Sequence, residues 1–176
     1  METTLHTFID IFNYTYTIDD EPVALTKIII PIIQRDYAQG RLSESVNRKR
    51  ERFLEALKEA VTEKPITLDF VYGDINKDGI MTPLDGQQRL TTLFLLHWYA
   101  AKKNNINENE YSFLKQFSYE TRYSARDFCK YLIDFTPDFN NIISDDIIEQ
   151  SWFPLDWKKD PTIHSMLVML DSINEK

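Results

Sequence analysis

The sequence contains little cysteine and no long apolar run, and each shortage excludes a class of protein. The single cysteine, Cys129, excludes an internal disulfide and a zinc site built from several cysteines. No run approaches the roughly 18 apolar residues that a membrane span requires. The first residues lack the basic region of a signal peptide and carry Glu2 and Asp10. We therefore expect a cytoplasmic protein without a membrane partner.

Positive charge is also scarce. Lys and Arg number 20 against 28 Asp and Glu, which gives a formal net charge of -8 at pH 7. A protein that binds nucleic acid over its whole surface needs Lys and Arg there to neutralise phosphates, so this balance argues against such a surface. Residues 35–52 differ, because basic side chains are in excess there: Arg35, Arg41, Arg48, Lys49, Arg50 and Arg52 against Asp36, Glu44 and Glu51. This stretch is either a solvated helix face or a local patch for DNA.

The sequence is rich in apolar and aromatic residues. Hydrophobic residues make up 43% of the 176 residues, and they include 11 Phe and 3 Trp. A chain of this length and composition can bury a full core. We therefore expect a folded domain, and the mixture of helical and strand periodicities predicts an α+β fold.

The first part of the chain is predicted to be a small mixed sheet with packed helices. A β-branched run at residues 27–33 predicts a strand that either lies at a sheet edge or ends at Pro31, which has no N–H to donate. Alternation at residues 66–72 predicts a half-buried strand, and residues 76–79 predict a hairpin turn before a return strand at 80–84. Helices are predicted near residues 5–12, from Ser43 to about Thr62 with Val46, Phe53, Leu57 and Val61 on its apolar stripe, and from Gln87 to about Lys103, where the helix is apolar on nearly all sides and should be central.

The second part is predicted to be a helical extension. The polar run at residues 104–110 predicts a boundary between residues 1–104 and residues 105–176. Helices are predicted at about residues 124–135 and 144–150, and a last helix begins at Asp160-Pro161, a capping residue followed by Pro at the first helical position. Its apolar stripe continues to the end of the sequence without a closing signal, so we expect a longer parent protein.

The segment Asp85-Gly86-Gln87-Gln88-Arg89-Leu90-Thr91-Thr92-Leu93 lies at the junction between a predicted strand and the predicted central helix. A helix N-terminus leaves backbone N–H groups without intrahelical partners and carries partial positive charge, which suits a phosphate. Gly86 would let an anion approach the backbone, and Arg89 could add a bidentate contact. The alternative is a capping pair of Asp85 and Gln88, which needs no ligand.

Two motifs point to a family. The segment Ile30-Pro31-Ile32-Ile33-Gln34-Arg35-Asp36-Tyr37, together with the Asp85–Leu93 segment, resembles the N-terminal domain family of GmrSD-type restriction endonucleases, which is related to the ParB and sulfiredoxin fold. The Asp-Gly-Gln-Gln-Arg motif is the more specific, and Ile33 stands where the family commonly has an aromatic residue. Residues 117–122 and 160–163 also resemble elements of one bacterial branch, so the resemblance covers most of the chain.

The resemblance implies a domain that binds, and in some members hydrolyses, a nucleoside triphosphate, with Mg²⁺ as the expected companion. The same resemblance implies a C-terminal nuclease domain or subunit that cuts modified or foreign DNA, as in defence against phage. It implies a ParB/sulfiredoxin-like α+β fold, and its nucleotide-binding residues would be Gln34, Arg35, Asp85, Gly86, Gln87, Gln88, Arg89 and Thr91. Tyr37 would be an aromatic wall of this site or a packed core residue.

Two other functions remain open from the sequence. The chain could recognise DNA without a nucleotide through the basic stretch, with Tyr37, Arg41, Arg48 and Arg50 as contacts. It could also be an interaction scaffold in which the second motif only caps a helix. Catalytic residues are not identified, and no metal site is expected, because the histidines are isolated and the calcium-like spacing from Asp74 to Asp85 is flanked by strands, not helices.

Overall fold

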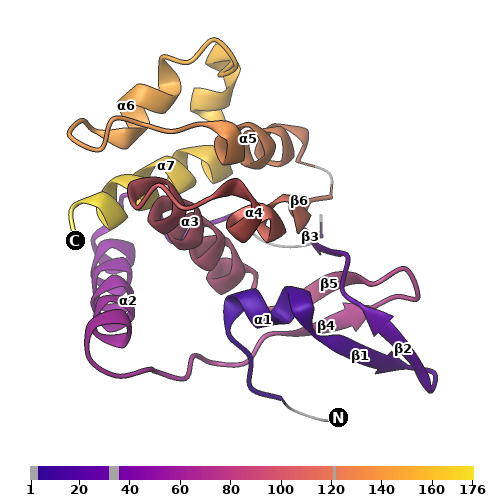
Figure 1. The fold of residues 1–176 in the computed structure, drawn as a ribbon. Coiled ribbons are helices and arrows are strands. Elements are labelled where there is room, and N and C mark those ends of the chain that lie inside the picture. Colours follow the sequence, from indigo (N-terminus) through magenta and orange to yellow (C-terminus); the bar gives the residue numbers. More distant parts are fainter. Residues whose placement is uncertain (1–3, 32–35, 121) are drawn as a thin grey trace.

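A four-stranded mixed sheet forms the β part of the structure, a computed structural model that describes residues 4–31, 36–120 and 122–176 (Figure 1). The strand order is β4-β5-β3-β6, with β3 parallel to both of its neighbours and β4 antiparallel to β5. The strands are β3 (Lys27–Ile30), β4 (Tyr72–Ile75), β5 (Ile80–Asp85) and β6 (Phe117–Tyr119), and a separate hairpin pairs β1 (Thr15–Ile18) with β2 (Glu21–Ala24). The predicted α+β fold is confirmed.

Strand β3 is an interior strand. Its β-branched residues Ile28 and Ile30 are buried in the core, and β5 and β6 pair with its two edges. The placement at a sheet edge was therefore wrong. The alternative, that the strand ends at Pro31, is confirmed, because a Pro beyond the last paired residue removes no bond from the ladder.

The strand predicted at residues 66–72 is wrong for all but its last residue. Strand β4 begins at Tyr72, because pairing with β5 begins there. In the preceding segment Leu68 and Val71 pack against the core, whereas Phe70 is exposed. The buried residues therefore do not follow the alternation, and a strand without a neighbouring ladder has no partner for its backbone groups.

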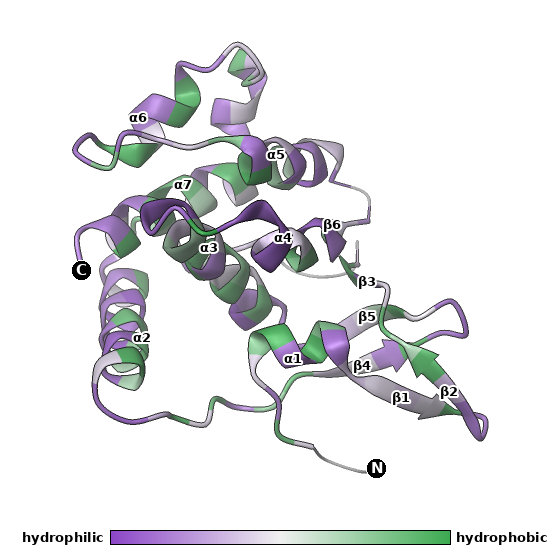
Figure 2. Ribbon diagram, in the orientation of Figure 1, coloured by the Kyte–Doolittle hydropathy of each residue, from purple (hydrophilic) through white to green (hydrophobic). Residues whose placement is uncertain are grey.

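Helices α3 (Gln87–Lys103) and α7 (Pro161–Asn174) pack side by side in the core, and Figure 2 shows hydrophobic residues along both. In α3 the side chains of Leu90, Phe94, Leu95 and Trp98 are fully buried, which confirms the predicted central helix. Asp160 caps α7 through the N–H groups of Thr162 and Ile163, also as predicted. The helices are α1 (Phe8–Asn13), α2 (Glu44–Thr62), α3 (Gln87–Lys103), α4 (Glu108–Tyr111), α5 (Tyr123–Asp134), α6 (Ile143–Ile148) and α7 (Pro161–Asn174), with 3-10 turns at Ser112–Gln116 and Leu155–Lys159.

The buried face of α2 agrees with its predicted stripe at Leu57 and, in part, at Phe53, but not at Val61. Arg50, Leu54 and Leu57 are buried, whereas the side chain of Val61 is 82% exposed. Burial is concentrated in the middle turns of α2, whereas its last two residues and residues 63–67 after it are exposed.

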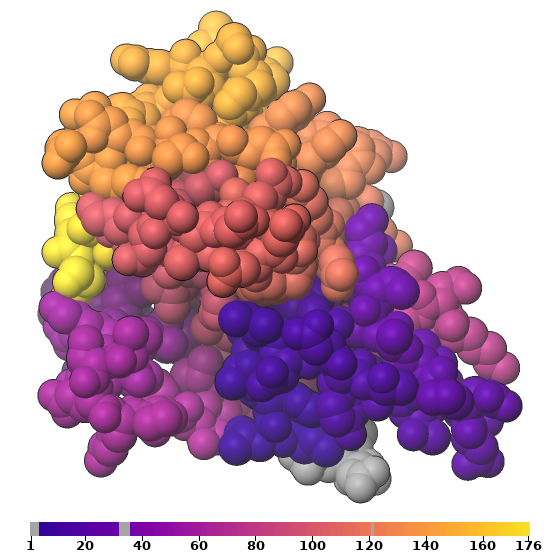
Figure 3. All heavy atoms as spheres, viewed as in Figure 1, coloured from indigo at the N-terminus to yellow at the C-terminus, as the bar shows by residue number. Residues whose placement is uncertain are grey.

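Segments on either side of residue 104 contact one another. Strand β6 belongs to the predicted extension but pairs with β3. Phe113 packs against Phe8 of α1, where Figure 3 shows the two segments in contact. The division at residue 104 stays a prediction. Within the described residues no helix is both long enough and apolar enough to cross a membrane.

Candidate functional site

The junction between β5 and α3 is built around Gly86. This residue is the N-cap of α3 and has φ of 91°, a left-handed conformation that favours glycine. A Cβ there would also lie 2.6 Å from Cγ2 of Val71. Glycine is thus required by backbone conformation and by the close approach of Val71. The predicted capping pair of Asp85 and Gln88 was wrong, because the N-cap is Gly86 and the Gln88 side chain bonds elsewhere.

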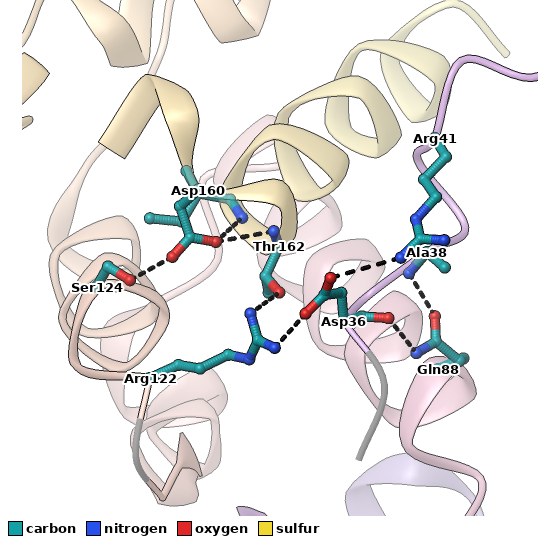
Figure 4. Close-up of polar contacts among 9 residues, drawn as sticks. Asp36, Ala38, Arg41, Gln88, Arg122, Ser124, Asp160 and Thr162 are labelled. Atoms are coloured by element: carbon teal, nitrogen blue, oxygen red, sulfur yellow. Dashed lines mark hydrogen bonds and ion pairs between the residues drawn. The ribbon is translucent and has the colours of Figure 1, made fainter. Parts of the chain in front are cut away.

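Gln88 joins the two sequence motifs (Figure 4). Its Oε1 accepts a hydrogen bond from the Ala38 N–H at 2.8 Å, and its Nε2 donates to the Asp36 carbonyl at 3.1 Å. Both ends of the side-chain amide are therefore used, one by Asp36 of the first motif and the other by Ala38, which follows it. Gln34 and Arg35, the other predicted residues of that motif, lie outside the described residues.

Tyr37 is a core residue, 1% exposed. Its hydroxyl lies 2.8 Å from Oγ1 of Thr92, which also donates to the side chain of Gln39. Burial raises the pKa of the Tyr37 hydroxyl above its ordinary value, although the bond to Thr92 opposes the shift. Of the roles considered for Tyr37, core packing is the one the structure shows, and its ring has no surface to offer DNA.

Thr91 is also directed into the core. It is 1% exposed, and its hydroxyl lies 2.9 Å from the Tyr119 hydroxyl on β6. Burial raises the pKa of Tyr119 as well, so this hydroxyl pair is neutral at physiological pH. In this structure Thr91 connects α3 to the sheet and has no surface for a nucleotide.

A cleft of about 470 Å³ opens beside the start of α3. It separates α2 from the β5–α3 junction, and the segment after the first motif forms its third side. Gln87, in its wall, is held by a bond from its Nε2 to the Pro83 carbonyl at 2.9 Å. The lining residues are Ala38, Gln39, Val46, Lys49, Arg50, Leu84, Asp85, Gln87 and Gln88.

Arg89 is not among the lining residues. Its Nη2 donates to the Phe70 carbonyl at 2.6 Å, and looser ion pairs join it to Asp69 at 3.6 Å and Asp85 at 3.7 Å. Its Nε is buried without a hydrogen-bond partner among the described residues. A direct contact between Arg89 and a phosphate therefore requires the guanidinium to leave these partners.

The basic stretch divides into buried and exposed residues. Arg50 is 8% exposed, and its guanidinium donates to the Gln39 carbonyl and to Asn47 Oδ1, each at 3.1 Å. Its predicted role as a surface contact for DNA does not fit this burial. Arg48 is exposed beside Glu44, and Arg41 is exposed with a pair to Asp36 at 3.5 Å.

Sequence analysis missed several residues of this region. The cleft is also lined by Val46, Lys49 and Gln39. In the sequence, Val46 and Lys49 lie in the helix predicted from Ser43, and Gln39 lies two residues after the first motif. Arg122 was also missed as a contact. It pairs with the Asp36 carboxylate and donates to Thr162 Oγ1 at 3.2 Å, while Ser124 bonds the Asp160 carboxylate (Figure 4).

The residues with calcium-like spacing form a hairpin turn. Asn76 Oδ1 accepts hydrogen bonds from the N–H groups of Asp78 at 3.0 Å and Ile80 at 2.9 Å. Gly79 has a positive φ of 74°, which suits that turn. Among the described residues, no group of three or more His, Cys, Asp or Glu side chains is placed to hold a metal ion.

A known protein family matches this chain over most of its length. The family model for the N-terminal domain of the GmrSD restriction endonuclease matches residues 16–175. The chain belongs to this family. No curated protein and no solved structure matches it. The match to the GmrSD domain includes every residue that lines the cleft and also the helices α5 and α7, so the cleft lies wholly within the family domain.

Proposed function

We propose that this GmrSD-type domain binds a nucleoside triphosphate with Mg²⁺ in the cleft, and that occupancy regulates a restriction endonuclease acting on DNA. The nuclease centre would belong to another domain or subunit, because the described residues hold no metal-binding cluster of acidic or histidine side chains. Hydrolysis of the triphosphate stays a prediction of the family resemblance.

One observation supports this proposal above the others. The cleft brings the Asp-Gly-Gln-Gln-Arg junction, the segment after the first motif and the basic helix α2 to one place. Its volume of about 470 Å³ lies in the range of about 300–1,000 Å³ usual for small-molecule sites. The fold thus places residues that are far apart in the sequence around one cavity, where a single ligand could contact them.

The charges around the cleft fit a triphosphate bound with a divalent cation. Lys49 and Arg50 supply positive charge from α2, and the start of α3 adds the partial charge of a helix N-terminus. The carboxylate of Asp85 would repel a bare phosphate, but it is an oxygen ligand of the kind that Mg²⁺ prefers. Gln87 and Gln88, the first two residues of α3, line the cleft beside Asp85.

The test is a titration of the four common ribonucleoside triphosphates with Mg²⁺, followed by calorimetry and thermal unfolding. At a ligand concentration of about 100 times Kd, binding stabilises the native state by about 2.7 kcal/mol. For a domain of this size that corresponds to a rise in Tm of about 5–10 °C. We expect Lys49→Ala to reduce the rise. Arg48→Ala is the matched control. It removes the same charge from the preceding position of α2, and Arg48 does not line the cleft.

The proposal fails if no triphosphate shifts the Tm of the wild type. It also fails if the two substitutions weaken binding equally, because the effect would then come from the overall charge of α2. A release assay for inorganic phosphate on the same samples decides whether hydrolysis accompanies binding.

A second function, DNA recognition by the exposed face of α2, retains one supporting observation. Arg48 and Lys49 are exposed, and Arg52 continues this face one turn later. If these three residues contact phosphates, the logarithm of the association constant should fall with the logarithm of salt concentration with a slope of about -2.7. A gel-shift series with duplex DNA between 50 and about 200 mM salt measures this slope.

A further inference from the structure

The wall of the cleft formed by Ala38 and Gln39 is held from two sides. The wall belongs to the segment of residues 36–40. On one side Gln88 forms hydrogen bonds with the main chain of this segment, at the Asp36 carbonyl and the Ala38 N–H. On the other side the Asp36 carboxylate points away from α3 and meets Arg122 at the N-cap of α5 (Figure 4). Asp36 therefore contacts the β5–α3 junction with its main chain and the second half of the molecule with its side chain.

Arg122 connects this wall to α7. Its Nη1 donates to Oγ1 of Thr162, a fully buried residue in the first turn of α7, at 3.2 Å. Ser124, two residues further along α5, bonds the Asp160 cap of the same helix. The guanidinium thus joins three segments, because the wall, the start of α5 and the start of α7 all meet at it.

A backbone contact makes the same segment sensitive to α7. A Cβ built at Gly40 would lie 1.8 Å from the carbonyl oxygen of Ser165 in α7. Only a glycine allows the segment to pass this close to the helix. The segment is therefore enclosed between α3 and α7, and a shift of either helix would move the wall.

Among the described residues, the Asp36 carboxylate has two cationic partners of different kinds. Arg41 is local, exposed and 3.5 Å away, whereas Arg122 is 86 residues distant, closer and less exposed. Two partly buried charges in contact attract more strongly than exposed ones, because solvent screens them less. Without Arg122 the carboxylate would keep Arg41, which cannot tie the segment to α5 and α7.

We propose that Arg122 is a positioning residue for the cleft: through Asp36 it fixes the Ala38–Gln39 wall, so that the packing of α5 and α7 and the state of the cleft are coupled. The part of this inference that concerns ligand affinity rests on the proposed function. The positioning of the wall does not. By linkage, a ligand that orders the wall would in turn stabilise the starts of α5 and α7.

The first experiment needs no ligand. The Ala38 N–H donates a hydrogen bond to Gln88. Its hydrogen exchange is measured in the wild type and in Arg122→Gln. We expect exchange to become about fivefold faster, the size of effect that a partly exposed charge pair gives. Arg126→Gln is the matched control, because Arg126 lies one turn later on α5 and pairs only with its neighbour Asp127 and the ring of Tyr123 among the described residues. Equal exchange in the two variants would overturn the proposal.

A double-mutant cycle then shows whether Arg122 acts through Asp36. If it does, Asp36→Asn combined with Arg122→Gln should change Ala38 exchange no more than Asp36→Asn alone, since Asp36→Asn already removes the pair with Arg122. Additive effects would mean that Arg122 stabilises the fold by another route, and would also overturn the proposal. Arg122→Lys, which keeps the charge, should restore part of the protection.

The ligand arm uses the triphosphate that the wild type binds best, with Mg²⁺. We expect Arg122→Gln to weaken its affinity about fivefold and Arg126→Gln to leave it unchanged. An unchanged affinity beside faster exchange would overturn the coupling to the ligand. If the wild type binds no triphosphate, the proposed function fails, and the exchange measurements still decide the positioning role.

Discussion

Replacing Gln88 tests whether the second motif serves mainly to hold the first. Gln88→Met keeps the length of the side chain but removes both the acceptor for the Ala38 N–H and the donor to the Asp36 carbonyl. A hydrogen bond contributes about 0.5–1.5 kcal/mol net, and leaving its partner unpaired in a partly buried place raises the cost. We therefore expect a loss of about 2 kcal/mol in the free energy of unfolding, or about 4–8 °C in Tm.

A second substitution at the same position separates the two bonds. Gln88→Glu keeps an acceptor for the Ala38 N–H but places a carboxylate against the Asp36 carbonyl. Near neutral pH it should destabilise at least as much as Gln88→Met. Folding raises the pKa of the introduced carboxyl, so its protonated form regains a donor. The destabilisation should therefore be largest near neutral pH, shrink as the pH falls toward about 4.3, the ordinary pKa of Glu, and stay constant below it.

Urea unfolding followed by circular dichroism measures these differences, provided that the m-value is unchanged. Gln87→Met is the graded comparison, since among the described residues the Gln87 side chain makes one hydrogen bond, to the Pro83 carbonyl. Its loss should cost about 1 kcal/mol. Unfolding free energies within about 0.5 kcal/mol of wild type for Gln88→Met would refute the reasoning. If that variant were stable but no longer bound triphosphate, Gln88 would contact the ligand and would not serve mainly to hold the first motif.

Two further predictions follow from the same region. Gly86→Ala forces a side chain into a left-handed conformation against Val71, so thermal unfolding should show a loss of about 1–3 kcal/mol, and an unchanged Tm would contradict the geometry. Burial lowers the pKa of His97 from 6.5, so the unfolded chain takes up a proton first and the unfolding free energy should fall as the pH drops below about 6.5. His97→Gln should flatten that decline in urea titrations between pH 5 and 8, whereas replacing the exposed His164 should not.

The sequence was sufficient for several features that depend on neighbours along the chain. The cap of α7 at Asp160-Pro161, the turn at residues 76–79 and the central helix from Gln87 were all predicted, because each rests on local hydrogen bonding or helical periodicity. The place of the second motif, between a strand and a buried helix, followed in the same way. The family also followed, since a specific motif does not need a fold to be recognised.

Other features were decided only by contacts between distant segments. Strand β6 could not be found from three residues, and residues 66–71 alternate like a strand but have no neighbouring ladder. Tyr37 and Arg50 have side chains that suit either a surface or an interior with hydrogen-bond partners. Thr92, Gln39 and Asn47 supply those partners. The sequence determined which residues form the helices and the motif, whereas tertiary packing decided which of their polar groups face the cleft, because burial depends on partners that folding brings from far along the chain.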